Sequence, residues 1–300
     1  MGKITVTVPA STANLGPGFD CLALALDLCN LTQIETMNEG IEVTIEGEGS
    51  DHLPKNPSNL VVQAFQEVYK TYGRPLPGLS IKQINQIPPA SGLGSSSSAI
   101  LAGILGASAF LARKLSTSEI LQFVLKFENH LDNAAAALLG GLTIVAKDEG
   151  QIFTHQVLVP DLVIVVTLPE LNLKTSKMRQ VLPKDIPLQD AVFNLSRVAL
   201  TVQAFQTGNF GMMEWSMKDR LHQPYRTALI PGFQEVEHAA REAGAAAVTL
   251  SGAGPAMVAF AGEDHENIAN AMIRAFQSNG VKARSFILPI HHNGAVVTMG

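Results

Sequence analysis

The amino-acid sequence predicts an α+β protein built from two domains. Its 300 residues are enough for two domains of ordinary size. Hydrophobic residues make up 46% of the chain and charged residues only 16%, so the chain can bury a large core. Strand and helix patterns alternate along the sequence, and a weakly structured turn near residue 150 separates two such blocks. We therefore expect domains over residues 1–157 and 158–300.

The first block combines a β-rich start with several helices. Alternating apolar residues predict the early strands, and apolar residues at i, i+4 spacing predict the first helix. Ser116 and Glu119 match a capping box, which marks the start of a later helix. The predicted elements are strands over 3–8, 21–28, about 31–37 and 41–46, a helix over 59–73, a strand over 79–85, an apolar helix over 99–112, a helix from Ser116, a short helix over 132–141, and strands over 142–146 and 151–157.

The second block begins with a strongly apolar segment that is typical of a buried strand. Helical periodicity follows, and then two short apolar runs flank a glycine-rich turn, which indicates a hairpin or close strand pair. The predicted elements are a strand over 159–169, helices over 188–205 and 233–243, paired strands over 245–250 and 256–260, a helix over 265–280 and a strand over 281–288.

Composition and residue spacing exclude several classes of protein. Acidic residues outnumber basic residues 26 to 21, so the chain lacks the positive charge of a nucleic-acid binder. The two cysteines form neither a disulfide framework nor a C-x-x-C pair, and the histidines show no H-x-x-x-H spacing on a helix. These spacings give no sign of a transition-metal site.

The hydrophobic segments do not indicate a membrane protein. A bilayer span requires about 20 predominantly apolar residues, whereas the most apolar helix covers only residues 99–112. The N-terminus alternates apolar and polar residues, which favours a strand over a signal peptide. We expect a cytoplasmic protein that binds neither nucleic acid nor a membrane.

A glycine- and serine-rich loop over residues 88–99 carries the clearest chemical signal. Gly92 and Gly94 allow the backbone to approach a ligand closely, and four serines then open the apolar helix. Free amides and the positive end of the helix dipole form an anion site, for which a polyphosphate is the natural occupant. The alternative is a serine-capped helix after a flexible loop. Neither the P-loop nor the Rossmann fingerprint fits this segment.

A second loop, over residues 9–26, holds Asn14 and Asp20 on a tight turn after the first strand. The glycines and the proline of this loop restrict its shape, so the two polar side chains are displayed on a rigid support. The alternative is a turn in which both side chains bond to their own backbone, as such residues commonly do.

Three motifs together show a family resemblance. PASTANLGPGFD (9–20), PPASGLGSSSSA (88–99) and LSGAGPAMVAF (250–260) resemble, in this order, the three motifs of the GHMP kinase superfamily. The first motif is similar to that of homoserine kinases. The resemblance implies a two-domain GHMP kinase fold, with an N-terminal domain like ribosomal protein S5 domain 2 and a ferredoxin-like C-terminal domain. It also implies transfer of the γ-phosphoryl group of MgATP to the hydroxyl of L-homoserine, in threonine biosynthesis, and dimerisation into a homodimer.

The resemblance also implies how the nucleotide is bound. Asn59 would lie beside the adenine, and Glu128 would hold Mg²⁺ together with Ser95 or Ser96, of which Ser96 is our choice. Asn129, Leu131 and Ala136 replace the Gly, Pro and Pro of the family pattern around Glu128. The residues expected to wrap the phosphates are Pro88, Pro89, Ala90, Ser91, Gly92, Leu93, Gly94, Ser95, Ser96, Ser97 and Ser98.

Homoserine is a zwitterion, so its pocket needs a cation, an anion and a neutral hydrogen-bonding group. By resemblance, Arg179 and Arg226 would bind the carboxylate, to which the planar guanidinium fork is suited, and Asp20 would bind the ammonium. The hydroxyl would be oriented by Asn14 and Asn133, and Thr175 would approach the transferring phosphoryl group. The alternative for each arginine is an exposed surface residue.

The reaction needs positioning and charge stabilisation more than covalent chemistry from the protein. Because the amide of Asn133 cannot accept a proton, we expect catalysis by alignment, with the neighbouring Asp132 as a structural residue. Two other functions stay open. One is a GHMP kinase for another alcohol, such as mevalonate or shikimate, and the other is a scaffold that binds nucleotide without turnover.

Overall fold

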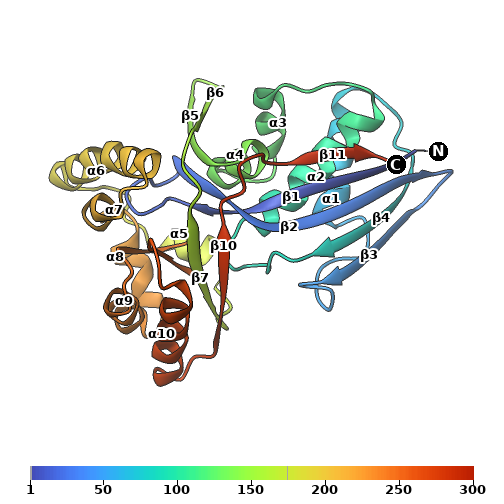
Figure 1. Cartoon of the computed structure of the whole chain (residues 1–300). Helices are drawn as coiled ribbons and strands as arrows, with labels where there is room; N and C mark the ends of the chain where they lie inside the picture. Colours follow the sequence, from blue (N-terminus) through green and yellow to red (C-terminus); the bar gives the residue numbers. More distant parts are fainter. Residues whose placement is uncertain (1, 174) are drawn as a thin grey trace.

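The structure is a computed structural model that describes residues 2–173 and 175–300. Two β-sheets lie side by side in it, each covered by helices (Figure 1). The first sheet has the strand order β11-β1-β2-β4-β3, and β5 joins it by pairing with β2 and β6. Its strands are β1 (Lys3–Ala13), β2 (Leu22–Met37), β3 (Ile41–Gly47), β4 (Gly78–Asn85), β5 (Leu142–Asp148), β6 (Gln151–Val157) and β11 (Val296–Met299).

Helices cover one face of the first sheet because alternate residues of its strands are apolar. Val6, Ile34 and Ile81 on that face are fully or almost fully buried. They belong to one core with Phe65 of the first helix and Leu101 of the second. The helices are α1 (Leu60–Thr71), α2 (Ser95–Phe110), α3 (Thr117–Val124) and α4 (Asp132–Leu139). The capping box of Ser116 and Glu119 begins α3 as predicted.

The second sheet is antiparallel, with the order β10-β7-β9-β8. Its strands are apolar on both faces because both are covered. Val166 packs in a core with Phe205, whereas Val165 on the opposite face packs in a core with Phe276. The elements are β7 (Val163–Pro169), β8 (Ala247–Leu250), β9 (Met257–Phe260), β10 (Ala283–Pro289), α5 (Thr175–Gln180), α6 (Leu188–Thr207), α7 (Phe210–Ser216), α8 (Gln223–Arg226), a 3₁₀ turn (Thr227–Leu229), α9 (Phe233–Glu242) and α10 (His265–Ser278).

One strand prediction is wrong: the segments 21–28 and 31–37 form the single strand β2. The interruption that the sequence suggests is a β-bulge. Pro9 of β1 faces Cys29 and Ala10 faces Leu26, so Asp27 and Leu28, which lie between Leu26 and Cys29, have no partner on β1. The bulge bends β2, and its two halves pair with different neighbours, β4 and β5.

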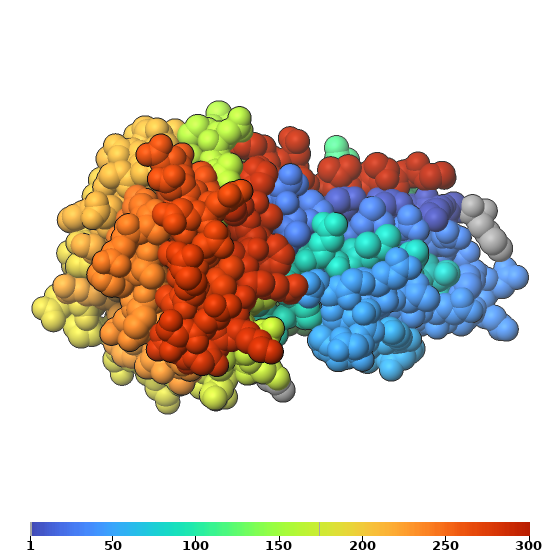
Figure 2. Space-filling view, turned by 60° about the horizontal axis from the view of Figure 1, so that its bottom comes forward, coloured from blue at the N-terminus to red at the C-terminus, as the bar shows by residue number. Residues whose placement is uncertain are grey.

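The sequence analysis did not predict the last strand, β11, which pairs with β1 in the first sheet. Figure 2 shows the red C-terminal end of the chain lying along the blue N-terminal part. The division into domains over 1–157 and 158–300 remains a proposal, and within it we assign residues 296–299 to the first domain. Among the described residues, no helix is both long and apolar enough to cross a membrane.

Candidate active site

The glycine- and serine-rich loop leads directly into α2, and its glycines have a steric purpose. Gly94 is the N-cap residue of α2, with φ of +72°, and no side chain caps the helix. The first-turn amides are therefore not consumed by a capping side chain. Gly92 has φ of +87°, and a Cβ at this position would overlap the carbonyl oxygen of Ser251. The loop can therefore approach the turn 251–255 only because residue 92 is glycine.

Two cavities lie on either side of this loop, and Ala90, Ser95 and Ser96 line both of them. The larger cavity has a volume of about 420 Å³ and is lined mainly by polar and charged side chains. The smaller has about 170 Å³, and Leu53, Pro54 and Leu60 contribute apolar walls. The helix N-terminus thus faces a junction between a charged compartment and a less polar one.

The larger cavity brings together most of the side chains singled out in the sequence. These include Asn14, Asp20, Glu128, Asn133, Thr175, Arg179 and Arg226, together with Ala90, Ser91, Gly92, Gly94, Ser95, Ser96 and Ser97. Asn59 and Pro89 line the smaller cavity instead. Pro88, Leu93 and Ser98 line neither cavity, and their buried positions support the shape of the loop.

The serine hydroxyl that contacts Glu128 belongs to Ser97. Its Oγ donates a hydrogen bond of 2.6 Å to Oε2 of Glu128. Ser96, which the sequence analysis chose as the metal ligand, lines the same cavity without this bond, because residues one position apart on a helix point in directions about 100° apart, and its role stays a prediction. The pair of carboxylate and hydroxyl oxygens is a donor set that suits a hard cation such as Mg²⁺.

Asp20 and Arg179 form a two-fold ion pair inside the cavity. Nη1 of Arg179 donates to Oδ2 of Asp20 at 3.0 Å, and Nη2 donates to Oδ1 at 2.6 Å. Burial lowers the pKa of Arg179, but the hydrogen bonds and the charge of Asp20 outweigh it, so the pKa is raised overall. Both side chains are about one-third exposed, which leaves the pair accessible to a ligand.

Arg226 is fully buried behind this pair and is held by the protein backbone. Its Nε donates to the carbonyl of Met178 at 3.2 Å, and its Nη1 donates to the carbonyl of Gly252 at 3.1 Å. Among the described residues, none accepts a hydrogen bond from Nη2, and the residue lines the cavity. Burial, followed by repulsion from Arg179, lowers the pKa of Arg226 to about 10, so the side chain stays charged at neutral pH.

The sequence analysis did not single out His222, which holds Arg226 in place. Nη1 of Arg226 lies 3.1 Å from Nδ1 of His222, and Nε2 lies 2.8 Å from the carbonyl of Gly16. Arginine can only donate, so Nδ1 is the acceptor and Nε2 carries the proton. Burial lowers the pKa of His222, which agrees with a neutral ring. Its proximity to Arg226 could not be read from the sequence, since a buried histidine beside a short helix has no distinctive pattern.

Asn14 and Asn133 differ in which of their hydrogen-bonding groups remain available to a ligand. Asn14 donates to the carbonyl of Gly252 at 2.7 Å and accepts from the backbone amide of Asp20 at 3.0 Å, so both polar atoms of its amide already bond within the protein, although Nδ2 carries a second hydrogen. Oδ1 of Asn133 accepts from Ser11 at 3.0 Å, whereas its Nδ2 has only a long contact of 3.5 Å with Asp132. Asn133 therefore retains a donor that faces the cavity.

His130 and Asp132 form a second pair at the cavity wall, in which Asp132 is buried and His130 is partly buried. Nδ1 of His130 lies 3.4 Å from Oδ1 of Asp132, and the same oxygen accepts from the backbone amide of Asn133 at 2.8 Å. The hydrogen bond to Asp132 is the main reason that the pKa of His130 is raised. Asp132 thus already stabilises the first turn of α4.

A fold of two helix-covered sheets, with a glycine- and serine-rich loop at the N-terminus of a buried helix, defines the class of GHMP kinases. The family model described as "GHMP kinases N terminal domain" matches residues 59–141, and "GHMP kinases C terminal" matches residues 201–282.

Individual relatives narrow this class. A homoserine kinase from Prochlorococcus marinus (strain MIT 9303) is 43% identical over 98% of this chain and 95% of its own length. A homoserine kinase from Moorella thermoacetica is 45% identical over 97% of this chain and 99% of its own. The crystal structure of homoserine kinase from Cytophaga hutchinsonii is 28% identical and superposes with a TM-score of 0.88, over 99% of this chain and 97% of that one. This chain belongs to the homoserine kinase family of the GHMP kinases.

The His130–Asp132 pair predicts a pH-dependent stability. Because the pKa of His130 is raised on folding, its contribution is fully present below the unfolded imidazole pKa of about 6.5 and is lost as pH rises through the folded value. We expect His130→Gln to reduce the free energy of unfolding by about 0.5–1 kcal/mol more at pH 5.5 than at pH 8.5. Urea unfolding at both pH values measures this, with exposed His155→Gln as the matched control. An equal loss at both pH values would contradict the assignment.

Proposed function

We propose that this protein transfers the γ-phosphoryl group of ATP to the side-chain hydroxyl of L-homoserine and forms O-phospho-L-homoserine. The observation that carries the proposal is the position of the α2 N-terminus, whose loop is the common wall of a charged cavity and a less polar one. A nucleotide that lies with its base in the smaller cavity would pass its phosphates along the loop amides. Its terminal phosphate would then reach the compartment that holds Asp20, Arg179 and Arg226.

In this proposal Asn59 shapes the base pocket rather than reading the base. Its Nδ2 donates to the carbonyl of Pro54 and to Oε1 of Gln83, and its Oδ1 accepts from the amide of Val61. With these bonds the side chain caps α1 and uses both hydrogens of its Nδ2, so it has no donor left for the base. Discrimination of the base would rest on the shape and the apolar walls of the cavity.

Glu128 and Ser97 would hold Mg²⁺ in the same arrangement. Both residues line the large cavity together with the glycine- and serine-rich loop, and carboxylate and hydroxyl oxygens are ligands that Mg²⁺ prefers. When bound, Mg²⁺ supplies positive charge that neutralises the phosphate oxygens during transfer. The hydrogen bond between Ser97 and Glu128 orients both oxygens before a cation arrives.

The amino-acid end of the substrate would meet Arg226, Arg179 and Asp20. The unused Nη2 of Arg226 is a donor for the substrate carboxylate, while Asp20 retains acceptor capacity for the ammonium beside its bonds to Arg179. Asn14 positions Asp20 through the backbone amide of that residue, so we assign it this role rather than contact with the substrate hydroxyl. An ammonium-free alcohol such as mevalonate would leave Asp20 without its ligand.

Asn133 would orient the reacting hydroxyl through its available Nδ2, and Thr175 would lie near the phosphoryl group. The hydroxyl oxygen forms a bond to the γ-phosphorus while the bond to the β,γ-bridging oxygen breaks, and the hydroxyl proton leaves to a phosphate oxygen. Asp132 already accepts from His130 and from the amide of Asn133, which supports a structural role for it. Catalysis would come from alignment and charge stabilisation.

A homodimer also belongs to the proposal. Leu188, Val192 and Leu195 are 80%, 56% and 71% exposed and occupy one face of α6 at i, i+4 and i+7. This apolar face would be covered by a second copy of the chain.

A substrate panel tests the proposed reaction. We expect release of ADP from ATP only with Mg²⁺ present, and with L-homoserine far above mevalonate, shikimate and L-threonine. A coupled ADP-release assay measures the turnover, and binding of ATP is measured separately by calorimetry. Turnover with mevalonate or shikimate instead would show a different GHMP kinase, whereas ATP binding without turnover on any alcohol would show a scaffold.

Arg226 should affect the amino acid much more than the nucleotide. Loss of a charge-assisted hydrogen bond of about 1.5–3 kcal/mol corresponds to a rise of about 10- to 100-fold in the KM for homoserine. We expect this for Arg226→Lys, which keeps the charge but loses the planar fork, with the KM for ATP nearly unchanged. Steady-state kinetics measure both values, with the exposed Arg74→Ala as the control. Equal losses for both substrates would mean that the pocket is misplaced.

Asp132→Asn distinguishes alignment from general-base catalysis. A positioned base contributes about 10²- to 10⁴-fold, so its removal would reduce kcat strongly. If the carboxylate is structural, kcat should fall by much less than about a thousandfold, and the protein should become less stable. Single-turnover kinetics and thermal unfolding measure the two effects, with exposed Asp148→Asn as the matched control. A fall of kcat beyond a thousandfold at unchanged stability would overturn the alignment mechanism.

A further inference from the structure

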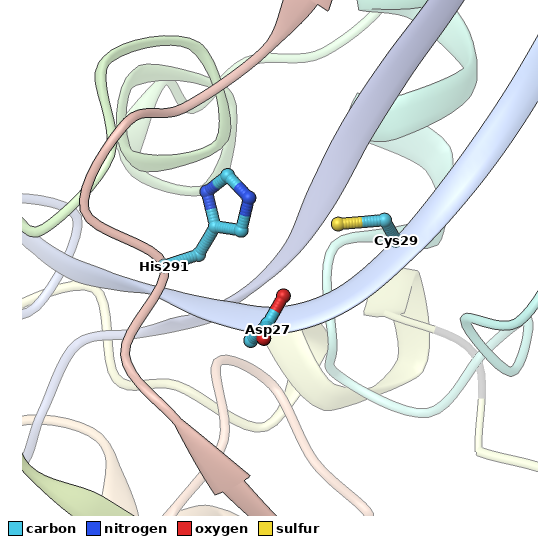
Figure 3. A group of neighbouring side chains, drawn as sticks. All are labelled: Asp27, Cys29 and His291. Atoms are coloured by element: carbon cyan, nitrogen blue, oxygen red, sulfur yellow. The ribbon is translucent and has the colours of Figure 1, made fainter.

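Three side chains with metal-binding atoms meet outside the two cavities. Asp27 and Cys29 come from β2, and His291 comes from the segment that leads from β10 to β11. One ligand atom of each lies within 4.8 Å of the others. Figure 3 shows the sulfur of Cys29 and the carboxylate of Asp27 turned toward the imidazole of His291, with one ring nitrogen facing the sulfur.

The backbone beneath this cluster is fixed on both sides. The amide of His291 donates to the carbonyl of Ala25 at 3.1 Å, and the amide of Gly141 donates to the carbonyl of His291 at 2.9 Å. Ile290 forms a β-bridge with Leu26. Asp27 lies in the β-bulge of β2, where it has no partner on β1, and bulges commonly redirect a side chain in this way.

The imidazole of His291 is not satisfied by the protein. Its Nδ1 is buried and has no hydrogen-bond partner among the described residues. In Figure 3 this atom lies on the side of the ring away from Cys29, and Nε2 is the nitrogen that faces the sulfur, so Nε2 is the atom that could bind a cation together with Cys29. His292, its neighbour, differs because its Nε2 pairs with Asp161 at 2.9 Å.

We propose that Asp27, Cys29 and His291 bind one Zn²⁺ ion, with water as the fourth ligand. A thiolate, an imidazole and a carboxylate form a mixed S, N, O set that suits zinc, whereas Mg²⁺ takes oxygen ligands. Zinc bonds of about 2.0–2.3 Å place tetrahedral ligand atoms roughly 3.3–3.8 Å apart, so these side chains would close by about 1 Å. Asp27 is exposed and free to move by this amount. The thiol proton of Cys29 leaves to solvent when the sulfur binds the metal.

Zinc at this position would tie β2 to the segment through which the chain returns from the second sheet to the first. The tie would resist detachment of β11 from β1, because His291 lies between β10 and β11. The measurements that test zinc binding are therefore metal content, cysteine ligation and thermal stability rather than kinase activity.

The proposal is tested on the full-length protein after treatment with a chelator. We expect one equivalent of Zn²⁺ to bind in the presence of excess Mg²⁺, and to raise Tm by about 5 °C when free zinc is about 100 times the Kd. Co²⁺ in place of Zn²⁺ should give a thiolate-to-cobalt charge-transfer band in the near ultraviolet. Metal analysis, differential scanning calorimetry and absorption spectroscopy measure these effects.

Single substitutions show whether zinc binds to this cluster or to other side chains of the protein. Cys29→Ser should abolish the cobalt band, and His291→Gln should weaken zinc binding and remove the Tm rise. The neighbouring Cys21→Ser and His292→Gln should leave both unchanged. Asp27→Asn should retain the cobalt band and bind zinc more weakly. A band that persists in Cys29→Ser, or zinc binding that is the same in His291→Gln as in the unchanged protein, would overturn the proposal.

Should a variant fail to fold, the unchanged protein still decides the question. Zinc should protect Cys29 from alkylation by iodoacetamide much more than Cys21, and peptide mass spectrometry locates the label. No protection, or equal protection of both cysteines, would refute the site.

Discussion

Contact between the glycine- and serine-rich loop (88–99) and the turn 251–255 is the constraint on which the rest of the site depends. Oγ of Ser251 donates to the carbonyl of Gly92 at 2.7 Å, and the amide of Ala256 donates to the carbonyl of Ser91 at 3.1 Å. The carbonyl of Gly252 then accepts from both Asn14 and Arg226. One short turn from the second sheet thus holds the loop, the N-terminal turn and the deepest arginine at once. Side chains larger than glycine at Gly92 would separate them.

In the proposed function, the two arginines and Asp20 of the large cavity supply charges of both signs for an amino acid. Two guanidinium groups lie near the same aromatic ring, with Arg179 and Arg226 at 5.6 and 5.2 Å from the centroid of Phe19. Their mutual repulsion contributes to the lowered pKa of Arg226, and Asp20 offsets it in part. A substrate carboxylate would relieve this repulsion, while the ammonium of the same molecule would restore a partner to Asp20. The internal ion pair of Asp20 and Arg179 keeps both groups oriented in the absence of substrate.

The path of the chain joins the two halves more tightly than a division at residue 158 suggests. After β10 the chain crosses back at His291, passes the bulge of β2 and adds β11 to the outer side of β1 (Figure 1). Both ends of the chain therefore lie in one sheet. The proposed zinc cluster occupies this crossing, while the proposed kinase site occupies the other contact between the halves.

The sequence by itself determined the class of fold, the strands other than β11, the helices of eight or more residues and the glycine- and serine-rich loop, but not α5, α7, α8 or the 3₁₀ turn. These features are local, because apolar periodicity, capping residues and glycines act within a few positions of one another. It also singled out Asp20, Arg179 and Arg226, but only through their motifs.

Tertiary structure decided which atoms remain free to act. Only the fold could show that Ser97 contacts Glu128, that Asn14 bonds to Gly252 and Asp20, and that His222 holds Arg226. It also brought His291 beside Asp27 and Cys29, from opposite ends of the chain. Pairings between distant segments depend on how whole sheets pack, and no short stretch of residues encodes that packing.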